Sequence, residues 1–263
     1  MKSKKNKRMK SRNKKGIYIF PNLITSCSLF GGFYAIIAAI QGSFDAAAIA
    51  ILISSLFDGL DGKIARFTNT TSKFGTEYDS LSDLVAFGVA PGLLAFQLCL
   101  KPLGRFGWLA VFLYLICGAL RLARFNIQKT TLESQHFKGL PIPGAAILIA
   151  SFVLFVHSLG ELMPNQHIVL IIMYLLSFLM VSTIDYVSFK GLGLFKRRPF
   201  NALVATILLF IVVAYKPGLM LFLFSALYVL SGPAMMLYRF ARRSSTATDA
   251  SLNNREKRAT NEL

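Results

Sequence analysis

Residues 57–91 read FDGLDGKIARFTNTTSKFGTEYDSLSDLVAFGVAP, and this stretch sets four aspartates at helical spacings. Asp58 and Asp61 end one apolar segment, and Asp79 and Asp83 begin the next. Residues three or four apart lie on one face of a helix, so each segment is expected to present a pair of carboxylates. A connection of about eight residues would make the two helices antiparallel neighbours. The four carboxylates are therefore predicted to converge on one pocket.

Such a cluster needs compensating charge, because carboxylates repel one another strongly where water is scarce. Lys63 and Arg66 offset part of the charge. Divalent cations would offset more, and oxygen ligands with no His or Cys nearby favour hard ions such as Mg²⁺ or Mn²⁺ over zinc. Gly62, Ala65 and Gly75 leave room for a ligand or a neighbouring backbone.

Long apolar segments extend to both sides of this stretch. The chain of 263 residues is 54% hydrophobic, with a mean hydropathy of +0.56. About 20 apolar residues cross a membrane as a helix, and unpaired backbone groups in lipid are too costly for other open structures. An all-α integral membrane protein with about eight transmembrane helices is predicted, at residues 22–40, 44–66, 76–100, 106–125, 141–159, 166–185, 200–215 and 218–238.

The net charge of +17 is distributed as the topology of a membrane protein requires. With the N-terminus in the cytoplasm, 26 of the 29 Lys and Arg residues fall on the cytoplasmic side of the eight helices. Both termini are then cytoplasmic. Basic residues at helix ends, rather than along one soluble face, argue against nucleic-acid binding. The apolar segment 22–40 is longer than the 7–15 residues of a signal-peptide core, so it is expected to be retained.

The chain divides into four parts. Residues 1–20 form a basic arm that is expected to lie on the anionic inner leaflet. Residues 21–185 form a core of six spans, residues 186–243 add two C-terminal spans, and residues 244–263 form a disordered cytoplasmic tail.

Histidine and cysteine contribute no recognisable site. His136, His157 and His167 stand in no metal-ligand spacing, and are expected in loops or at the membrane interface. The three cysteines lie inside apolar segments and are predicted to be small core residues: Cys27, Cys99 and Cys117.

The aspartate stretch resembles the signature of the CDP-alcohol phosphotransferases. All eight positions agree in the series Asp58-x2-Asp61-Gly62-x2-Ala65-Arg66-x8-Gly75-x3-Asp79-x3-Asp83. The resemblance implies a helical membrane enzyme, usually a homodimer, that uses two divalent cations on the cytoplasmic side. Asp58, Asp61 and Asp79 would be metal ligands, and Asp83 a ligand of the second metal and the general base. The residues implied for binding the CDP-lipid are Asn22, Thr25, Gly62, Arg66, Ser72 and Gly75.

The chemistry of that class suits a carboxylate cluster. An alcohol must displace CMP from a CDP-linked lipid, and two metals can stabilise the charge that develops on the phosphate oxygens. An alcohol is a poor nucleophile at neutral pH, so a carboxylate must accept its proton.

Four further segments suggest the acceptor alcohol. The segments are PNLIT at 21–25, SDLVAFGVAP at 82–91, RLARFN at 121–126 and GLPIP at 139–143. Together they resemble the membrane-integral phosphatidylserine synthases of bacteria and archaea, from about residue 20 to 145. This resemblance implies CDP-diacylglycerol as donor, L-serine as acceptor, and a bacterial inner (cytoplasmic) membrane. The candidates for holding the serine carboxylate, the amino group or the lipid phosphate are Arg121, Arg124, Asn126 and Lys138.

Other readings stay open at this point. Glycerol 3-phosphate, inositol phosphate and choline are alternative acceptors, although choline favours an aromatic cage that is not evident beside the motif. A cation transporter would also use carboxylates, but its ionisable residues are expected nearer to mid-membrane.

Overall fold

The computed structural model describes residues 19–68, 72–131, 137–160, 164–186 and 216–238. The α-helices are α2 (Ile19–Ile40), α3 (Phe44–Phe67), α4 (Lys73–Asp83), α5 (Ala90–Ala95), α6 (Arg105–Thr131), α7 (Ile142–Ser158) and α8 (Gln166–Val181). Two π-helical segments and a 3₁₀ turn extend α4 and α5 into one helical run over Lys73–Leu103: η1 (Leu84–Val89), η2 (Phe96–Leu100) and η3 (Lys101–Leu103). A further helix spans Pro217–Tyr238.

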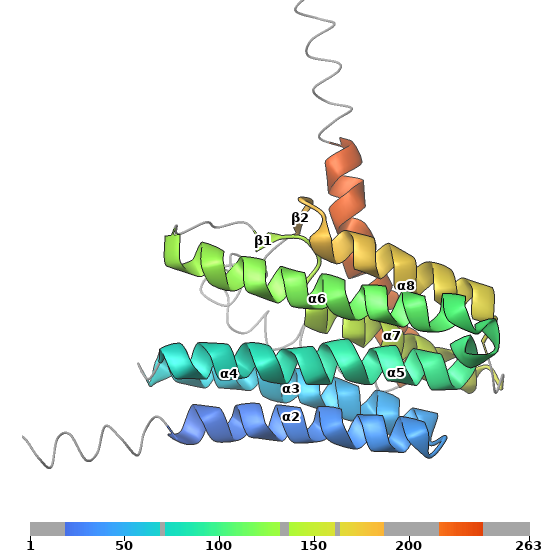
Figure 1. The fold of residues 1–263 in the computed structure, drawn as a ribbon, viewed down its shortest axis with the longest axis horizontal. Coiled ribbons are helices and arrows are strands. Elements are labelled where there is room, and N and C mark those ends of the chain that lie inside the picture. The colour runs from blue at the N-terminus through green and yellow to red at the C-terminus, as the bar shows by residue number, and fades with distance from the viewer. Residues whose placement is uncertain (1–18, 69–71, 132–136, 161–163, 187–215, 239–263) are drawn as a thin grey trace, which may run out of the picture.

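The helices form a bundle with η1 and α5 at its centre (Figure 1). The antiparallel helices α2 and α3 pack against each other most extensively, α6 packs against α8, and α3 packs against α7. The central segments η1 and α5 contact α2, α3, α6 and α7. Small residues allow this close packing: a Cβ on Gly32 would meet the backbone of Ala86, and contacts between small residues bring membrane helices together.

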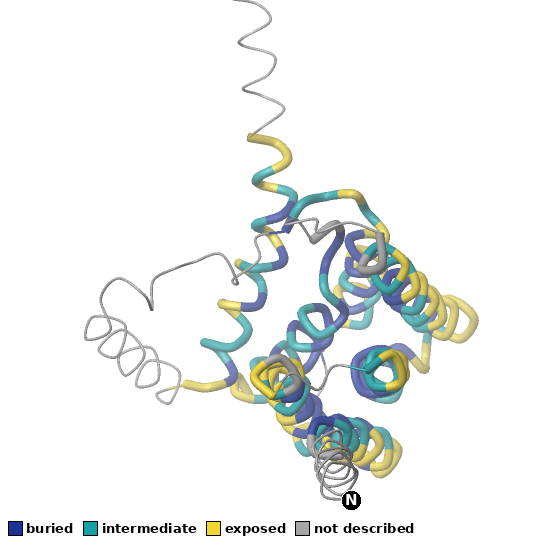
Figure 2. Tube along the Cα trace, turned by 90° about the vertical axis from the view of Figure 1, so that its left-hand side faces the viewer, coloured by how far each residue is buried: buried dark blue, intermediate teal, exposed yellow. Residues whose placement is uncertain are grey.

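The surface of the bundle is apolar. On the outer helices of the bundle, exposed residues face outward and buried residues face the interior (Figure 2). Many of the exposed residues are large hydrophobics; Phe30, Leu56, Phe106 and Phe178 are each 69% or 70% exposed. Exposed apolar surface on this scale is unfavourable in water and is the expected surface of a protein in lipid.

Four of the described helical stretches are long and apolar enough to cross a membrane: Pro21–Ile40, Lys73–Leu103, Arg105–Gln128 and Pro217–Tyr238. Helix α3 has 24 residues but carries the aspartates, whereas α7 and α8 have 17 and 16 residues. The predicted span 200–215 lies outside the described residues. The prediction of a helical membrane protein is confirmed, and the count of eight spans stays a prediction.

The third predicted span begins earlier than expected. Helix α4 starts at Lys73 rather than at residue 76, because the Ser72 hydroxyl accepts a hydrogen bond of 2.9 Å from the Gly75 N–H and caps the helix. Such a cap satisfies one of the backbone donors that a helix start leaves unpaired.

A proline inside this long helix is compensated by a neighbouring side chain. Pro91 has no N–H to donate to the Phe87 carbonyl one turn earlier. The fully buried Tyr114 on α6 donates its hydroxyl to that carbonyl at 3.0 Å. The helix continues past Pro91. It departs from regular α-helical geometry in the π-helical segments before and after α5.

Two short strands were not expected in the all-α prediction. Strand β1 (Phe137–Lys138) pairs antiparallel with β2 (Asp185–Tyr186). The pairing continues through a hydrogen bond from Gly139 N to Ile184 O, and Leu140 N donates to Leu179 O in the last turn of α8. Pro141 is the N-cap of α7 and Pro143 is its second residue, where proline suits a helix start. The residues before Pro141 therefore lie outside the helix, and their backbone groups pair with the chain near the end of α8.

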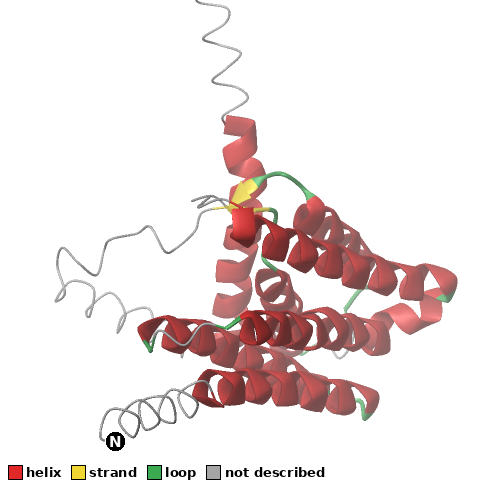
Figure 3. Ribbon diagram, turned by 60° about the vertical axis from the view of Figure 1, so that its left-hand side comes forward, coloured by secondary structure: helices red, strands yellow, loops and turns green. Residues whose placement is uncertain are grey.

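The last described helix lies along α7. Gly218 meets the backbone of Leu154, Phe222 stacks on Phe155 at 5.1 Å, and Ser225 shares a hydrogen bond of 3.0 Å with Ser151. The order of these contacts shows that the two helices run antiparallel. The end of the helix extends beyond the bundle beside β1 and β2 (Figure 3).

Candidate metal and substrate site

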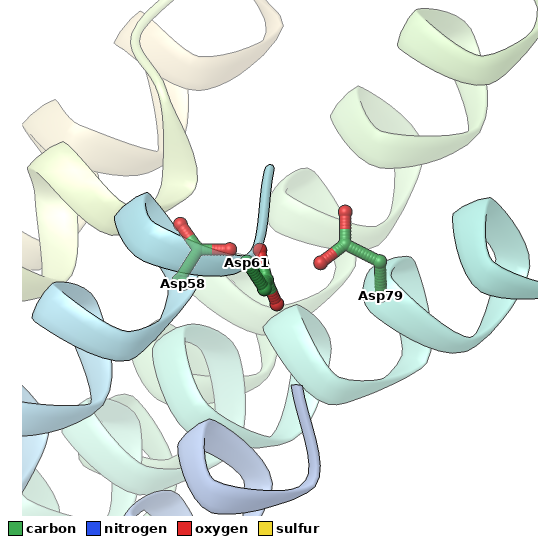
Figure 4. A group of neighbouring side chains, drawn as sticks. All are labelled: Asp58, Asp61 and Asp79. Carbon is green, nitrogen blue, oxygen red and sulfur yellow. The ribbon is translucent and has the colours of Figure 1, made fainter. Parts of the chain in front are cut away.

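Three aspartates meet between α3 and α4. Asp58 and Asp61 project from the last turns of α3, and Asp79 projects from α4 toward them (Figure 4). One carboxylate oxygen from each lies within 4.8 Å of the others. The predicted convergence of these three residues, which are up to 21 positions apart in the chain, is thus observed in the structure.

Asp83 extends the group by one helical turn. It is the last residue of α4, and its carboxyl group lies in hydrogen-bonding contact with Asp58 rather than inside the three-residue group. Arg121 from α6 lies within electrostatic range of both Asp58 and Asp83. The fourth predicted carboxylate therefore lies on the side of the site that faces α6.

The donor set fits a hard divalent cation. Oxygens bound to one Mg²⁺ at about 2.1 Å lie at most about 4.2 Å apart. The observed group needs only a small contraction to reach that size. Among the described side chains, Arg121 is the one buried cation, and a single positive charge does not balance four carboxylates. The arrangement can hold a metal ion, with Asp58, Asp61 and Asp79 as the ligands.

Helix α2 orients the site through Thr25. The Thr25 hydroxyl donates a 2.7 Å hydrogen bond to Asp61, and its oxygen also lies 3.1 Å from the Pro21 carbonyl. Ser82 on α4 donates to the Thr25 carbonyl at 3.2 Å. Thr25 was predicted to bind the CDP-lipid, and the structure adds a contact with a carboxylate that sequence reasoning missed. The 36 positions between Thr25 and Asp61 leave no local signal for that contact.

Asn22, Ser72 and Gly75 lie together beside the start of α4. A Cβ on Gly75 would lie 3.1 Å from the Ser72 hydroxyl and 3.3 Å from the Asn22 side-chain oxygen. Gly75 therefore permits the close approach of two polar side chains, and its contact with a ligand stays a prediction. Ser72 was expected to contact the CDP portion; here its hydroxyl caps α4.

Gly62 and Arg66 follow the aspartates on α3. Gly62 is exposed, with open space around the position that a Cβ would occupy. Arg66 is the second-last residue of the helix, and its side chain lies outside the described part of the structure.

The four acceptor candidates have different surroundings. Arg121 is 8% exposed, and its guanidinium faces the carboxylates. Arg124 donates a hydrogen bond of 3.4 Å to the Val181 carbonyl at the end of α8, and Asn126 donates to Ser80 at 3.0 Å. Lys138 lies in β1, and its side chain is not described. Arg121 and Arg124 are three residues apart on α6, but their side chains have different neighbours.

Two minor expectations change. Cys27 is exposed on α2, so its prediction as a core residue was wrong, whereas Cys99 and Cys117 are buried as predicted. His157 lies in the last turn of α7, where its Nδ1 is 2.7 Å from the Asp45 carboxylate. His167 is exposed in the first turn of α8, and His136 lies outside the described residues.

The fold and the site define a helical membrane bundle that carries paired aspartates on two neighbouring helices. Residues 18–188 match the model of the CDP-alcohol phosphatidyltransferase family, and the chain belongs to that family. It is an integral membrane protein.

Its relatives carry closely related names. The chain is 40% identical over 223 residues to the CDP-diacylglycerol–serine O-phosphatidyltransferase of Helicobacter pylori, covering 84% of this chain and 92% of the relative. The archaetidylserine synthase of Methanothermobacter thermautotrophicus is 38% identical over 180 residues, which is 66% of this chain and 71% of that protein. The serine O-phosphatidyltransferase of Bacillus subtilis is 37% identical over 172 residues, which is 65% of this chain and 90% of that protein.

Proposed function

We propose that this chain is an enzyme that transfers the phosphatidyl group of CDP-diacylglycerol to L-serine, giving phosphatidylserine and CMP. The observation that carries the proposal is the meeting of Asp58, Asp61 and Asp79 at one point between α3 and α4. Membership in the family supports the CDP-linked donor. The names of the relatives, which cover most of this chain, support serine as the acceptor.

The carboxylates would bind the divalent cations that the diphosphate of the donor requires. Asp58, Asp61 and Asp79 would hold one divalent cation, and Asp83 would take part in holding a second, with Mg²⁺ or Mn²⁺ as the ions. When bound, such ions neutralise the diphosphate and stabilise the charge that develops as CMP leaves. Thr25 keeps the Asp61 carboxylate in position through its hydrogen bond. The remaining candidates for holding the CDP-lipid are Asn22, Gly62, Arg66, Ser72 and Gly75.

Asp83 is the proposed general base. The serine hydroxyl oxygen attacks the phosphorus that carries the diacylglycerol, its proton passes to the Asp83 carboxylate, and the bond to the CMP oxygen breaks with its electron pair. A carboxylate suits this step because it accepts a proton from the hydroxyl as the new bond forms. Asp83 lies beside Asp58 and within electrostatic range of Arg121, so the base stands between the metal ligands and the acceptor candidates.

We infer a membrane arrangement in which the site and both termini face the cytoplasm of a bacterium. The proposed form is a homodimer of eight-span subunits in the inner membrane, with the basic arm at residues 1–20 on the anionic leaflet. A single cysteine placed at Thr68 and one placed at Ser43, each in a chain without native cysteines, test the orientation. A membrane-impermeant maleimide should label Ser43→Cys in intact cells and Thr68→Cys after permeabilisation; the reverse pattern would invert the topology.

An acceptor panel tests the reaction. Purified protein in liposomes is given CDP-diacylglycerol with L-serine, glycerol 3-phosphate, inositol phosphate or choline, and the release of CMP is measured. Serine should support turnover at the highest rate. Turnover with glycerol 3-phosphate and none with serine would overturn the acceptor assignment. Movement of Mn²⁺ across the vesicles without any CMP release would favour a cation transporter instead.

A further inference from the structure

A buried arginine stands opposite the metal ligands with part of its hydrogen-bonding capacity unused. Arg121 is 8% exposed, and its Nε–H has no hydrogen-bond partner among the described residues. Its guanidinium lies 5.9 Å from the centre of the Phe125 ring and within electrostatic range of Asp83 and Asp58. An unpaired buried N–H is costly, which indicates that a ligand completes its bonding.

The last described helix brings a tyrosine to the same place. Tyr228 lies within electrostatic range of Arg121, and its ring would lie 3.2 Å from a Cβ on Gly144, near the start of α7. One turn before Arg121, Gly118 packs against Ile142 on α7. The first turn of α7 therefore packs against both the helix that carries Arg121 and the helix that carries Tyr228.

Tyr186 fixes the position of the helix Pro217–Tyr238 relative to the bundle. The rings of Tyr186 and Tyr228 lie 5.8 Å apart, and the Tyr186 hydroxyl donates a hydrogen bond of 3.1 Å to the Val229 carbonyl. Burial, and to a lesser degree Tyr228, raises the pKa of Tyr186 to about 12, so this hydroxyl keeps its proton at neutral pH. The position of Tyr228 is thus determined by a contact with β2 and by packing on α7.

We propose that Arg121 and Tyr228 form the subsite for the carboxylate of the acceptor, so that the helix Pro217–Tyr238 completes the pocket begun by the family core. This inference rests on the proposed transfer to serine. Tyr228 lies beyond residues 18–188, the part of the chain that matches the family. The subsite would therefore be a contribution of the C-terminal region to acceptor choice.

The size of serine supports this assignment. Its hydroxyl and carboxylate groups are attached to adjacent carbon atoms, so the groups that receive them must also be neighbours. Asp83, the proposed base, and Arg121 are within electrostatic range of each other. A guanidinium binds a carboxylate through two parallel hydrogen bonds, and a tyrosine hydroxyl can add a third. Arg124 and Asn126 already bond to Val181 and Ser80, whereas the Nε–H of Arg121 is available.

The Tyr228→Phe variant tests the subsite, because it removes one hydroxyl and keeps the ring that packs on Gly144. We expect the KM for L-serine to rise about tenfold, as the loss of a hydrogen bond to a charged group predicts, with the KM for CDP-diacylglycerol unchanged. Serinamide has no carboxylate, so it cannot use the subsite. Its inhibition constant as a competitor of serine should therefore be the same in the variant and in the wild type. The matched control is Tyr238→Phe, at an exposed position of the same helix.

The possible results distinguish a failure of the proposed subsite from a failure of the proposed transfer to serine. An unchanged KM for serine in Tyr228→Phe would overturn the subsite while leaving the transfer to serine intact. Equal rises in the KM values for serine and CDP-diacylglycerol, with a lowered thermal midpoint, would also overturn it in favour of a structural role. Absence of turnover with serine in the wild type would instead overturn the proposed function.

A second inference concerns the opposite side of the site, where an apolar groove of about 630 Å³ runs between α2 and α3. One end is lined by Leu23 and Phe57, and the other by Tyr34 and Ala46. Phe57 directly precedes Asp58 on α3, so the first end of the groove lies at the level of the metal ligands along that helix. Ser26 provides a hydroxyl at this end, and the remaining lining is apolar or aromatic.

The length of the groove matches one leaflet of a bilayer. Leu23 to Tyr34 covers eleven helical steps of 1.5 Å, which is about 16 Å. Half of a hydrocarbon core of about 30 Å is about 15 Å. A groove that begins at the level of the carboxylates and runs for one leaflet has the length of a single extended acyl chain.

The geometry points to this groove as the site for one acyl chain of the CDP-linked lipid, an inference that also rests on the proposed function. A CDP-diacylglycerol with a diazirine midway along one chain tests it. Illumination should attach the lipid to residues 23–34 and 46–57, and excess unlabelled lipid should suppress the adducts. Adducts confined to other helices, or cross-links of this face to a second copy of the chain, would overturn the inference.

A pair of tryptophan variants gives an independent readout. Ile53→Trp narrows the groove, whereas Ile171→Trp adds the same bulk to an exposed position on α8. Only Ile53→Trp should raise the KM for long-chain CDP-diacylglycerol, by about fivefold or more, with the KM for a dihexanoyl analogue unchanged. Equal effects of both variants would contradict the assignment even if transfer to serine is normal.

Discussion

Asp79 and Asp83 lie one helical turn apart on α4, but their surroundings differ. Asp79 joins Asp58 and Asp61 in the group that can hold a metal ion, whereas Asp83 contacts Asp58 and lies near Arg121. Two carboxylates on one helix face can therefore serve different roles, and accepting the hydroxyl proton is proposed for Asp83 alone.

Replacement of the proposed base should separate catalysis from folding. We expect Asp83→Asn to lower the rate of CMP release by about 10² to 10⁴, because the amide cannot accept the hydroxyl proton. The thermal midpoint should stay near that of the wild type, since Asn preserves the shape of the side chain. Glu77→Gln, at an exposed acid on the same helix, serves as the control and should keep full activity. Turnover of Asp83→Asn within a few fold of the wild type would contradict the assignment.

Thr25 provides a test of how the metal ligands are oriented. Thr25→Val removes the hydroxyl that bonds to Asp61, and Thr25→Ser keeps it. Loss of a hydrogen bond to a charged group weakens an interaction by about 1.5–3 kcal/mol. We therefore expect the Mg²⁺ or Mn²⁺ concentration for half-maximal activity to rise about tenfold or more in Thr25→Val and to change little in Thr25→Ser. Equal metal requirements in both variants would show that Thr25 does not orient Asp61.

At the scale of the element, the run Lys73–Leu103 shows how one helix can carry a proline and still pack at the centre of the bundle. Pro91 leaves the Phe87 carbonyl without its α-helical donor, and the Tyr114 hydroxyl supplies one from α6. The small residues Ala86, Gly88 and Gly92 are buried along this run and allow neighbouring helices to approach.

A double-mutant cycle tests this compensation. Tyr114→Phe should destabilise the protein by about 1–2 kcal/mol, because it leaves a buried carbonyl unpaired. In a Pro91→Ala background the new N–H can bond to Phe87, so the same Tyr114→Phe change should cost less. Thermal or SDS-induced unfolding of the four proteins gives the comparison. Identical costs in the two backgrounds would mean that Tyr114 and Pro91 act independently.

Secondary structure in this chain could be predicted from local patterns, and the exceptions have local causes. The apolar segments and their charged ends predicted α2, α3, α7 and α8 to within about four residues, whereas α6 continues six residues past its predicted end. The start of α4 was misplaced because the Ser72 cap was overlooked, although a serine before a helix is a recognised start signal. The strands β1 and β2 were missed because each has two residues and depends on a partner about 48 positions away.

At the scale of the whole molecule, the proposed metal ions would also connect helices. Asp58 and Asp61 belong to α3 and Asp79 belongs to α4, so a bound ion bridges two elements that the carboxylate charges alone would push apart. The ion is therefore expected to stabilise the fold as well as the reaction.

Metal removal should affect both properties together. Chelation should abolish CMP release and lower the thermal midpoint, since an ion that binds the folded state stabilises it. Addition of Mg²⁺ or Mn²⁺ should restore both. Asp79→Asn should be inactive, and its thermal midpoint should respond much less to metal. A midpoint of the wild type that does not respond to chelation or to added metal would contradict the bridging role.

The sequence by itself determined the membrane character, the helical segments and the register of the four aspartates, because these properties depend on the spacing of residues within one segment. Tertiary structure alone decided which groups come together across segments: Thr25 bonds to Asp61, Tyr114 bonds to the Phe87 carbonyl, and Tyr228 lies within electrostatic range of Arg121. It also decided that Arg121 faces the carboxylates while Arg124 turns to α8. These outcomes depend on how each helix is rotated about its axis when the bundle packs, and residues 27 to 107 positions apart carry no local signal of that rotation.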